Sequence, residues 1–234
     1  MFEVFASTPE DMGPADIGAH AARAEAMGFY GLQVPDAVHD GLLLSALALN
    51  ATTRLVVQTS VLVAFPRSPM ITAVAAWDLQ SMSGGRFELG IGTQVKGNIE
   101  RRYSARWDSP VPQLREYVQS IRAIFHSFQT GEALCFEGNH YQLTRLQPFF
   151  NPGPIDYPSV PIFCGAVGPD MTRMVARVAD GMITHPTNTP PRYIREVCIP
   201  RLQDGFDKAG RASTDFTLVL GPLTATGSDE DAVA

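Results

Sequence analysis

The sequence has few of the features that mark an exported, membrane-spanning or metal-binding protein. Its three cysteines, Cys135, Cys164 and Cys198, lie far apart and in no metal-ligand spacing. We therefore expect reduced thiols, with Cys164 in the core, and no metal site. No basic segment followed by an apolar one opens the chain, and no apolar run approaches the roughly 18 residues of a membrane helix. These absences favour a cytoplasmic protein with no membrane partner.

Positive charge is also scarce. The 234 residues contain 18 Lys and Arg against 24 Asp and Glu, for a formal net charge of -6. Neutralisation of phosphates by Lys and Arg supplies most of the affinity of nucleic-acid-binding proteins, so an acidic chain without a basic cluster argues against that class. Hydrophobic residues make up 45% of the chain, which suits a compact protein with a large core. A small molecule is the expected partner.

What the sequence does have is a regular alternation of strand-like and helix-like segments. Apolar strand candidates lie at residues 2–6, 29–34, 55–64, 86–91, 160–164, 182–184 and 216–223. Helical patterns lie between them, at about 14–28, 41–51, 68–82, 114–131, 169–180 and 192–209. Repeated strand–helix units predict an α/β fold with a parallel sheet, and eight such units close into a TIM barrel.

The alternation ends one strand short of a closed barrel. No G-x-G-x-x-G follows the first strand, as a doubly wound dinucleotide-binding fold would require. We therefore predict a TIM (β/α)8 barrel of one domain over residues 1–234, truncated after the seventh strand. We expect the native protein to continue past Ala234, because residues 227–234 resemble the cap and first turn of another helix. An open, doubly wound sheet is the alternative.

Residues 132–159 interrupt the alternation between the fourth helix and the fifth strand. Residues 134–136 and 141–143 flank Glu-Gly-Asn-His, which predicts a β-hairpin. Residues 146–159 contain four prolines and predict a long irregular connection. Such a connection is uncommon in a compact domain unless it serves a site, so we interpret residues 132–159 as a hairpin and loop insertion.

Residues 160–184 are the most informative stretch. A buried strand is followed by the small residues 165–168 and by a helix that starts at Pro169, with Met171, Met174, Val175 and Val178 predicted to face inward. Gly181 suits a left-handed cap at the end of this helix. A glycine turn before a helix presents free N–H groups and the positive end of the helix dipole to an anion such as phosphate. The alternative is that the glycines only make a tight turn.

Residues 83–93, SGGRFELGIGT, carry a resemblance to a known family. The chain resembles the bacterial luciferase-like flavin and deazaflavin enzymes, which have a segment like SGGRFxLGIGTG at the fourth strand. The likeness continues at residues 59–62 and 160–184. The predicted hairpin and the PFFNPGP run ending at Pro154 are similar to the branch that uses coenzyme F420. The resemblance implies a TIM barrel with a cofactor at the C-terminal strand ends. Relatives are commonly dimers, so the resemblance also implies a possible homodimer.

The resemblance also implies roles for individual residues. The backbone of the turn would bind the cofactor phosphate, with Thr184 and His185 beside it. Ser60 and Val61 match a non-proline cis peptide that lies behind the isoalloxazine ring. The residues that would hold the cofactor are Asp36, Ser60, Val61, Thr93, Asn98, Gly165, Ala166, Val167, Gly168 and Thr184.

Two departures from the family pattern concern the acid/base chemistry. Ala37 follows Asp36 where F420-dependent glucose-6-phosphate dehydrogenases and luciferases have His, and Val95 replaces an acidic residue. The chain is therefore not expected to share those enzymes' substrate or acid/base pair. Asp36 and His185 are the candidate catalytic residues; the alternatives are that Asp36 caps the following turn and that His185 binds the phosphate. Arg101, Arg102 and Arg106 would either bind the polyglutamate tail of F420 or be solvated charges on a helix face.

Taken together, these features predict an F420-dependent oxidoreductase that transfers a hydride between the deazaflavin and a small organic substrate. An FMN-dependent monooxygenase of the same fold is one alternative. A non-catalytic flavin-binding protein is the other, because the family's acid/base residues are missing.

Overall fold

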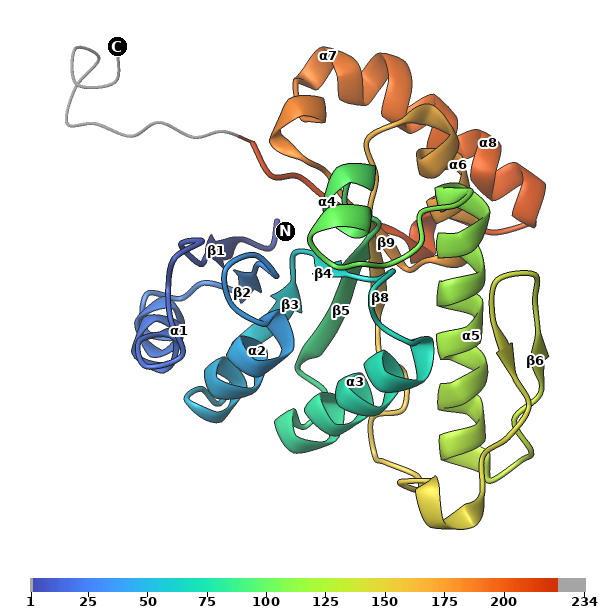
Figure 1. Ribbon diagram of the computed structural model, residues 1–234. Helices are drawn as coiled ribbons and strands as arrows, with labels where there is room; N and C mark the ends of the chain where they lie inside the picture. The colour runs from blue at the N-terminus through green and yellow to red at the C-terminus, as the bar shows by residue number, and fades with distance from the viewer. Residues whose placement is uncertain (1, 223–234) are drawn as a thin grey trace.

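Parallel strands form the centre of the molecule, and helices pack around their outer side (Figure 1). The computed structural model describes residues 2–222. Neighbouring strands of the main path are parallel, as repeated strand–helix units predict. In order along the sheet, they are β1 (Phe5–Ser7), β2 (Gly31–Val34), β3 (Val56–Thr59), β5 (Phe87–Gly92), β8 (Ile162–Gly165), β9 (Gly181–Ile183) and β10 (Thr217–Val219). This strand order confirms the predicted barrel topology.

The helices lie between these strands in the predicted alternation. The longer ones are α1 (Ile17–Ala26), α2 (Gly41–Asn50), α3 (Pro69–Ser83), α5 (Pro110–Thr130), α6 (Pro169–Val178) and α8 (Ile199–Ala209). A short helix, α4 (Lys96–Arg101), follows β5. The predicted helix at 192–209 comprises α7 (Pro191–Tyr193), a π-helical segment (Ile194–Cys198) and α8.

Local sequence explains where these helices begin, end and face. Ser68 caps α3 by accepting a hydrogen bond from the Met70 N–H, and Gly84 ends it in the left-handed conformation. The helical spacing of apolar residues predicts one inward stripe on α5. Every residue of that stripe is buried: Leu114, Tyr117, Val118, Ile121, Ile124, Phe125 and Phe128. On α3, helical spacing predicts that Met70, Val74 and Trp77 face inward, and this prediction is partly wrong. Trp77 is buried, but Val74 is 36% exposed, because the small residues Ala73 and Ala76 pack inward instead.

The structure corrects the prediction for Gly181. Helix α6 ends at Val178, Ala179 is extended, and Gly181 is a buried residue of β9. A Cβ atom at Gly181 would collide with the ring of Phe163, so glycine is required here by strand packing rather than by a left-handed turn.

Several predicted boundaries also differ from the structure. The first strand begins at Phe5, where its pairing with β2 starts, and the preceding Phe2 is 98% exposed. The third predicted strand is divided into β3 and β4 (Leu62–Val63) by a cis peptide bond between Ser60 and Val61. The predicted end of the last strand at Leu223 and the helical turn at 227–234 lie outside the described residues.

The predicted hairpin is present as the antiparallel strands β6 (Phe136–Glu137) and β7 (Gln142–Leu143). The connection after it contains only a 3-10 turn (Pro148–Phe150). The buried Glu116 carboxylate of α5 accepts a hydrogen bond from the His140 N–H, and Trp77 Nε1 donates to Gly153 O. The division into a barrel and an insertion at 132–159 stays a prediction.

The wall of the barrel is open between β1 and β10. In the described residues, β1 pairs only with β2, and β10 pairs only with β9. A cavity of about 600 Å³ separates the two strands and is lined by residues that include Phe5, Gln33 and Val219.

Candidate functional site

The C-terminal ends of the parallel strands meet on one face of the molecule, where TIM-barrel enzymes place their catalytic groups. The sheet topology brings most of the predicted site residues to this face. Ser60 and Val61 follow β3, Thr93 follows β5, residues 165–168 follow or end β8, and Thr184 and His185 follow β9.

The cis peptide between Ser60 and Val61, predicted from the resemblance, is present. The Val61 side chain lies against two glycines at the ends of neighbouring strands. A Cβ atom on Gly92 would come within 2.6 Å of Val61 Cγ2, and one on Gly165 within 3.4 Å of Val61 Cγ1. Thr59, the last residue of β3, is tied to β5 just before the cis peptide, because its hydroxyl donates to Gly90 O and accepts from the Gly90 N–H. Val61 thus forms an apolar bump at the centre of the strand ends.

Residues 165–168, predicted to bind the cofactor phosphate, form the turn between the end of β8 and the start of α6. Gly168 is the N-cap of α6 and no side chain caps this helix. A Cβ atom at Gly168 would meet nothing within 4 Å, so the backbone here borders open space. The first N–H groups of a helix have no partner within it, and the helix dipole adds partial positive charge. The carboxylate of Asp170, in the first turn, is paired with Arg173.

The turn after β9 fixes the orientation of His185. The Thr187 N–H donates to His185 Nδ1 at 3.2 Å. A backbone N–H can only donate, so Nδ1 presents its lone pair, and the neutral ring carries its proton on Nε2. The ring is exposed at the strand ends. His185 is therefore held as an Nε2–H donor.

Thr184 is buried, and its hydroxyl has partners inside the protein. Its Oγ1 accepts a hydrogen bond from the Gly221 N–H and lies 3.2 Å from Thr189 Oγ1. The structure therefore ties this side chain to the chain after β10. A direct contact of Thr184 with a cofactor stays a prediction.

Asp36 makes the capping contacts that were the alternative to a catalytic role. Its carboxylate accepts hydrogen bonds from the Gly41 N–H at 3.1 Å and the Val63 N–H at 2.9 Å. Arg67 Nη1 lies 2.8 Å from Asp36 Oδ2, and only 6% of the Asp36 side chain is exposed. The sequence analysis missed Arg67, which lies 31 residues along the chain from Asp36. A catalytic role for Asp36 stays a prediction.

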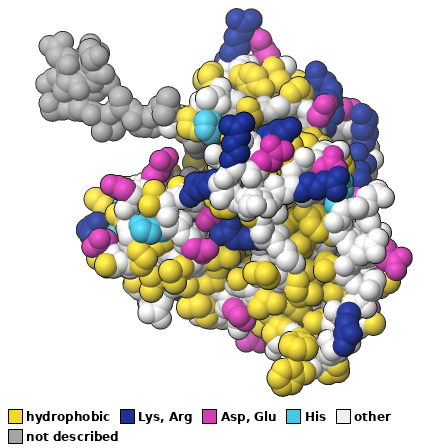
Figure 2. Space-filling view, viewed as in Figure 1, with side chains coloured by type: hydrophobic (Ala, Val, Ile, Leu, Met, Phe, Trp, Pro, Cys, Tyr) yellow, Lys and Arg dark blue, Asp and Glu magenta, His cyan; other side chains and the backbone are white. Residues whose placement is uncertain are grey.

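The segment after β5 presents polar and basic side chains. Thr93 Oγ1 donates to the neighbouring Gln94 O, and Asn98 lies half-buried in α4. Arg102 donates to Ala37 O at 2.6 Å and so connects α4 to the loop after β2. Arg101, Arg102 and Arg106 are exposed, and Figure 2 shows Lys and Arg side chains gathered around α4. This placement is compatible with either alternative for these arginines.

A polar ladder that periodicity did not predict crosses three strands inside the barrel. Gln33 Nε2 donates to Gln58 Oε1 at 3.0 Å, and Gln58 Nε2 donates to Glu88 Oε2 at 2.7 Å. The three residues are in register across β2, β3 and β5. Burial raises the pKa of Glu88 to about 7, although the Gln58 hydrogen bond opposes the shift.

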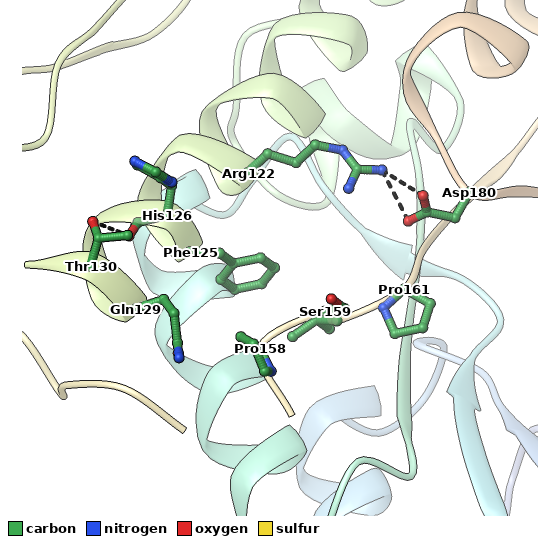
Figure 3. Close-up of a pocket in the computed structure, with 10 residues that line it drawn as sticks. Arg122, Phe125, His126, Gln129, Thr130, Pro158, Ser159, Pro161 and Asp180 are labelled. Carbon is green, nitrogen blue, oxygen red and sulfur yellow. Dashed lines mark hydrogen bonds and ion pairs between the residues drawn. The ribbon is translucent and has the colours of Figure 1, made fainter. Parts of the chain in front are cut away.

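A second hollow lies at the opposite end of the barrel (Figure 3). Its volume is about 570 Å³, and it lies beside Val160, which precedes β8, and Asp180, which precedes β9. Arg122 in its wall is bound to both carboxylate oxygens of Asp180. Because it lies at the N-terminal strand ends, this hollow is not the expected catalytic face.

Two further findings apply to residues 2–222. No three His, Cys, Asp or Glu side chains in this part of the chain are arranged to hold a metal ion. None of its helices combines the length and hydrophobicity needed to cross a membrane.

The parallel β/α wall, the non-proline cis peptide after β3 and the uncapped helix after β8 define a TIM-barrel protein of the luciferase-like type. The chain belongs to the luciferase-like monooxygenase family, whose model matches residues 1–234. An uncharacterized protein of Mycobacterium tuberculosis is 42% identical over 214 residues, which cover 92% of this chain and 63% of that protein. The chain thus spans less than two thirds of the length of this relative.

Two other similar proteins are named for coenzyme F420. The F420-dependent glucose-6-phosphate dehydrogenase of Nakamurella multipartita is 34% identical over 238 residues, covering 97% of this chain and 68% of that protein. The coenzyme F420-dependent tetrahydromethanopterin reductase of Methanopyrus kandleri superposes with a TM-score of 0.81 at 18% identity. The superposition covers 99% of this chain and 68% of the reductase, and it shows a shared fold.

Proposed function

We propose that this chain binds coenzyme F420 and catalyses hydride transfer between the deazaflavin and a small organic substrate. One observation carries the proposal: the Val61 side chain lies against Gly165, and the uncapped N-terminus of α6 begins at Gly168, later in the same turn. An apolar support for a flat ring therefore adjoins a set of backbone donors for a phosphate. The similarity to F420-dependent enzymes supports the choice of cofactor.

The residues at the strand ends fit such a cofactor. Gly92 and Gly165 leave room for Val61 behind a ring, and larger residues would displace it. Residues 165–168 offer backbone N–H groups beside open space at Gly168, which suits a phosphate. Thr93 and Asn98 supply polar groups nearby, on the segment after β5.

When bound, F420 would accept or donate a hydride at C5 of its ring. The chain would hold the ring face against Val61 and bind the phosphate at residues 165–168. His185 is the better placed of the two candidate catalytic residues, because the Asp36 carboxylate is already bound by Arg67 and two backbone N–H groups. Its Nε2–H would donate a hydrogen bond to a substrate oxygen and stabilise negative charge that develops there.

The same phosphate site and ring support would accommodate FMN, so the alternatives are separated by experiment. The purified chain is titrated calorimetrically with F420 and, separately, with FMN. We expect F420 to bind with a Kd near the micromolar range. A chain that binds FMN and not F420 would contradict the proposal and favour the monooxygenase.

Turnover separates an enzyme from a flavin-binding protein. With reduced or oxidised F420 and a panel of alcohols, aldehydes and enones, a hydride-transferring enzyme changes the deazaflavin absorbance without oxygen. A monooxygenase consumes oxygen with reduced FMN. Binding without turnover on any substrate would favour the non-catalytic protein.

A further inference from the structure

Asn188 connects the turn after β9 to the turn after β8. It lies at the end of a 3-10 turn (Pro186–Asn188) and is only 2% exposed. Its Oδ1 accepts from the His185 N–H at 2.7 Å, and its Nδ2 donates to Ala166 O at 2.9 Å. The backbone partners fix which end of the amide is oxygen and which is nitrogen, because a backbone N–H only donates and a carbonyl only accepts. One buried side chain thus holds two site turns together.

Tyr193 acts on the next peptide of the same turn. Its hydroxyl donates to Val167 O at 3.1 Å. Tyr193 is the last residue of α7 and directly precedes the π-helical segment. Asn188 and Tyr193 therefore bind the carbonyls of two consecutive residues, Ala166 and Val167.

Because the peptide bond is planar, these two contacts also set the direction of the N–H groups that follow. In a trans peptide the C=O of one residue and the N–H of the next point in opposite directions. Binding of Ala166 O by Asn188 therefore directs the Val167 N–H away from Asn188. Binding of Val167 O by Tyr193 likewise directs the Gly168 N–H away from Tyr193. In the described part of the chain no acceptor binds either N–H, and both residues are exposed.

We propose that Asn188 and Tyr193 are positioning residues that orient the Val167 and Gly168 N–H groups toward a phosphate ester. The class of ligand is a flavin-type cofactor with a phosphate on its side chain, and that identity rests on the proposed function. Neither side chain need touch the cofactor. Each side chain instead orients a peptide group whose N–H would contact the phosphate.

The test compares ligands that differ only in the phosphate. Kd values are measured for FMN against riboflavin, and for F420 against its deazaflavin without the phosphodiester tail. We expect Asn188→Ala to weaken the phosphorylated ligand by about ten- to a hundredfold, the range for lost hydrogen bonds to a charged group. The ligand without phosphate should lose less than about threefold. Tyr193→Phe, which removes one hydroxyl, should weaken only the phosphorylated ligand, and by less.

Asn151 provides a matched control. Its Oδ1 accepts from the Gly153 N–H and its Nδ2 donates to Ser127 O, so Asn151→Ala removes the same two kinds of bond far along the chain from this turn. Its ratio of affinities for FMN and riboflavin should equal that of the wild type. If Asn188→Ala does not fold, Asn188→Asp keeps the acceptor for His185 and removes the donor to Ala166 O.

The outcomes separate this inference from the proposed function. Equal losses for both ligands of a pair, or no loss for either, would show that Asn188 is merely structural. If the wild type binds neither cofactor, the proposed function fails, and the inference is tested with inorganic phosphate. Phosphate should then shift the amide resonances of Val167 and Gly168 in the wild type and not in Asn188→Ala. An absence of shifts in the wild type would overturn the positioning role as well.

Discussion

The guanidinium of Arg67 binds the carboxylate of Asp36, with Nη1 2.8 Å from Oδ2. Only 19% of the Arg67 side chain is exposed, and its other terminal nitrogen binds Asp40. Burial acts to lower the pKa of Arg67, but the two aspartates outweigh it and raise that pKa. The ion pair joins the loop after β2 to the segment between β4 and α3, so Asp36 holds one side of the candidate site in place.

Asp36→Asn should destabilise the protein by about 2 to 3 kcal/mol, because it leaves a largely buried guanidinium short of a countercharge. Urea unfolding measures the loss. Asp40→Asn is the matched control, since Asp40 also binds Arg67 but is 48% exposed and asparagine can still cap α2. The control should lose less than about 1 kcal/mol. Equal losses in the two variants would contradict a special role for the Asp36 pair.

Glu88 should make stability depend on pH. Its pKa in the folded protein is about 7, above its ordinary value of 4.5. Between these values the folded state binds more protons than the unfolded state, so stability falls as pH rises. A shift of that size corresponds to about 3 kcal/mol.

The measurement for Glu88 is urea unfolding of the wild type and Glu88→Gln at pH 4.5, 6 and 8. Other carboxylates have lowered pKa values, among them Glu25 and Asp40, so the difference between the two proteins is the relevant quantity. We expect the variant to gain stability relative to the wild type as pH rises. A difference that is constant with pH would refute the shifted pKa.

Gly92→Ala should disturb the site through Val61. The new Cβ atom would approach Val61 Cγ2 to 2.6 Å, and overpacking of this kind costs about 1 to 3 kcal/mol. The control is Gly97→Ala in α4, where a Cβ atom meets nothing within 4 Å and alanine favours the helix. Thermal unfolding of both variants tests the difference. A Gly92→Ala variant as stable as the wild type would show that Val61 moves freely.

The three thiols should differ in reactivity. Cys135 is exposed, whereas Cys164 and Cys198 are buried. Burial raises the pKa of Cys164 to about 12, which leaves almost no thiolate at neutral pH. A thiol reagent such as dithionitrobenzoate should therefore modify one cysteine rapidly in the native protein and all three in denaturant. Rapid native modification of the Cys135→Ser variant would contradict the burial of the other two.

Much of the fold was predictable because each element has a local signal. The period of the apolar residues distinguishes α5 from the strands, and Ser68-Pro69 and Gly84 mark the two ends of α3. Val74 shows the limit of such signals. Periodicity identifies an apolar stripe, but the face that packs closest is set by Ala73 and Ala76, whose small side chains let the helix approach its neighbours.

The candidate site was predictable only in part. The resemblance led to the cis peptide at Ser60 and Val61, which the structure contains, and the anion site expected at the glycine turn stays a prediction. Two contacts at the site could not be predicted from the sequence: the partner of the Asp36 carboxylate and the partner of Ala166 O. Arg67 and Asn188 lie 31 and 22 residues away from these groups along the chain. No local pattern relates residues at such separations.

The sequence alone determined the alternation of strands and helices, the parallel topology of the barrel and the family. These follow from periodicity, caps and a contiguous motif, all of which act between residues close in the chain. The tertiary structure decided that Asp36 is bound by Arg67, that Glu88 ends a polar ladder, and that Asn188 binds Ala166 O in the turn after β8. Such contacts depend on which strand ends and turns become neighbours, and that is settled only when the sheet assembles.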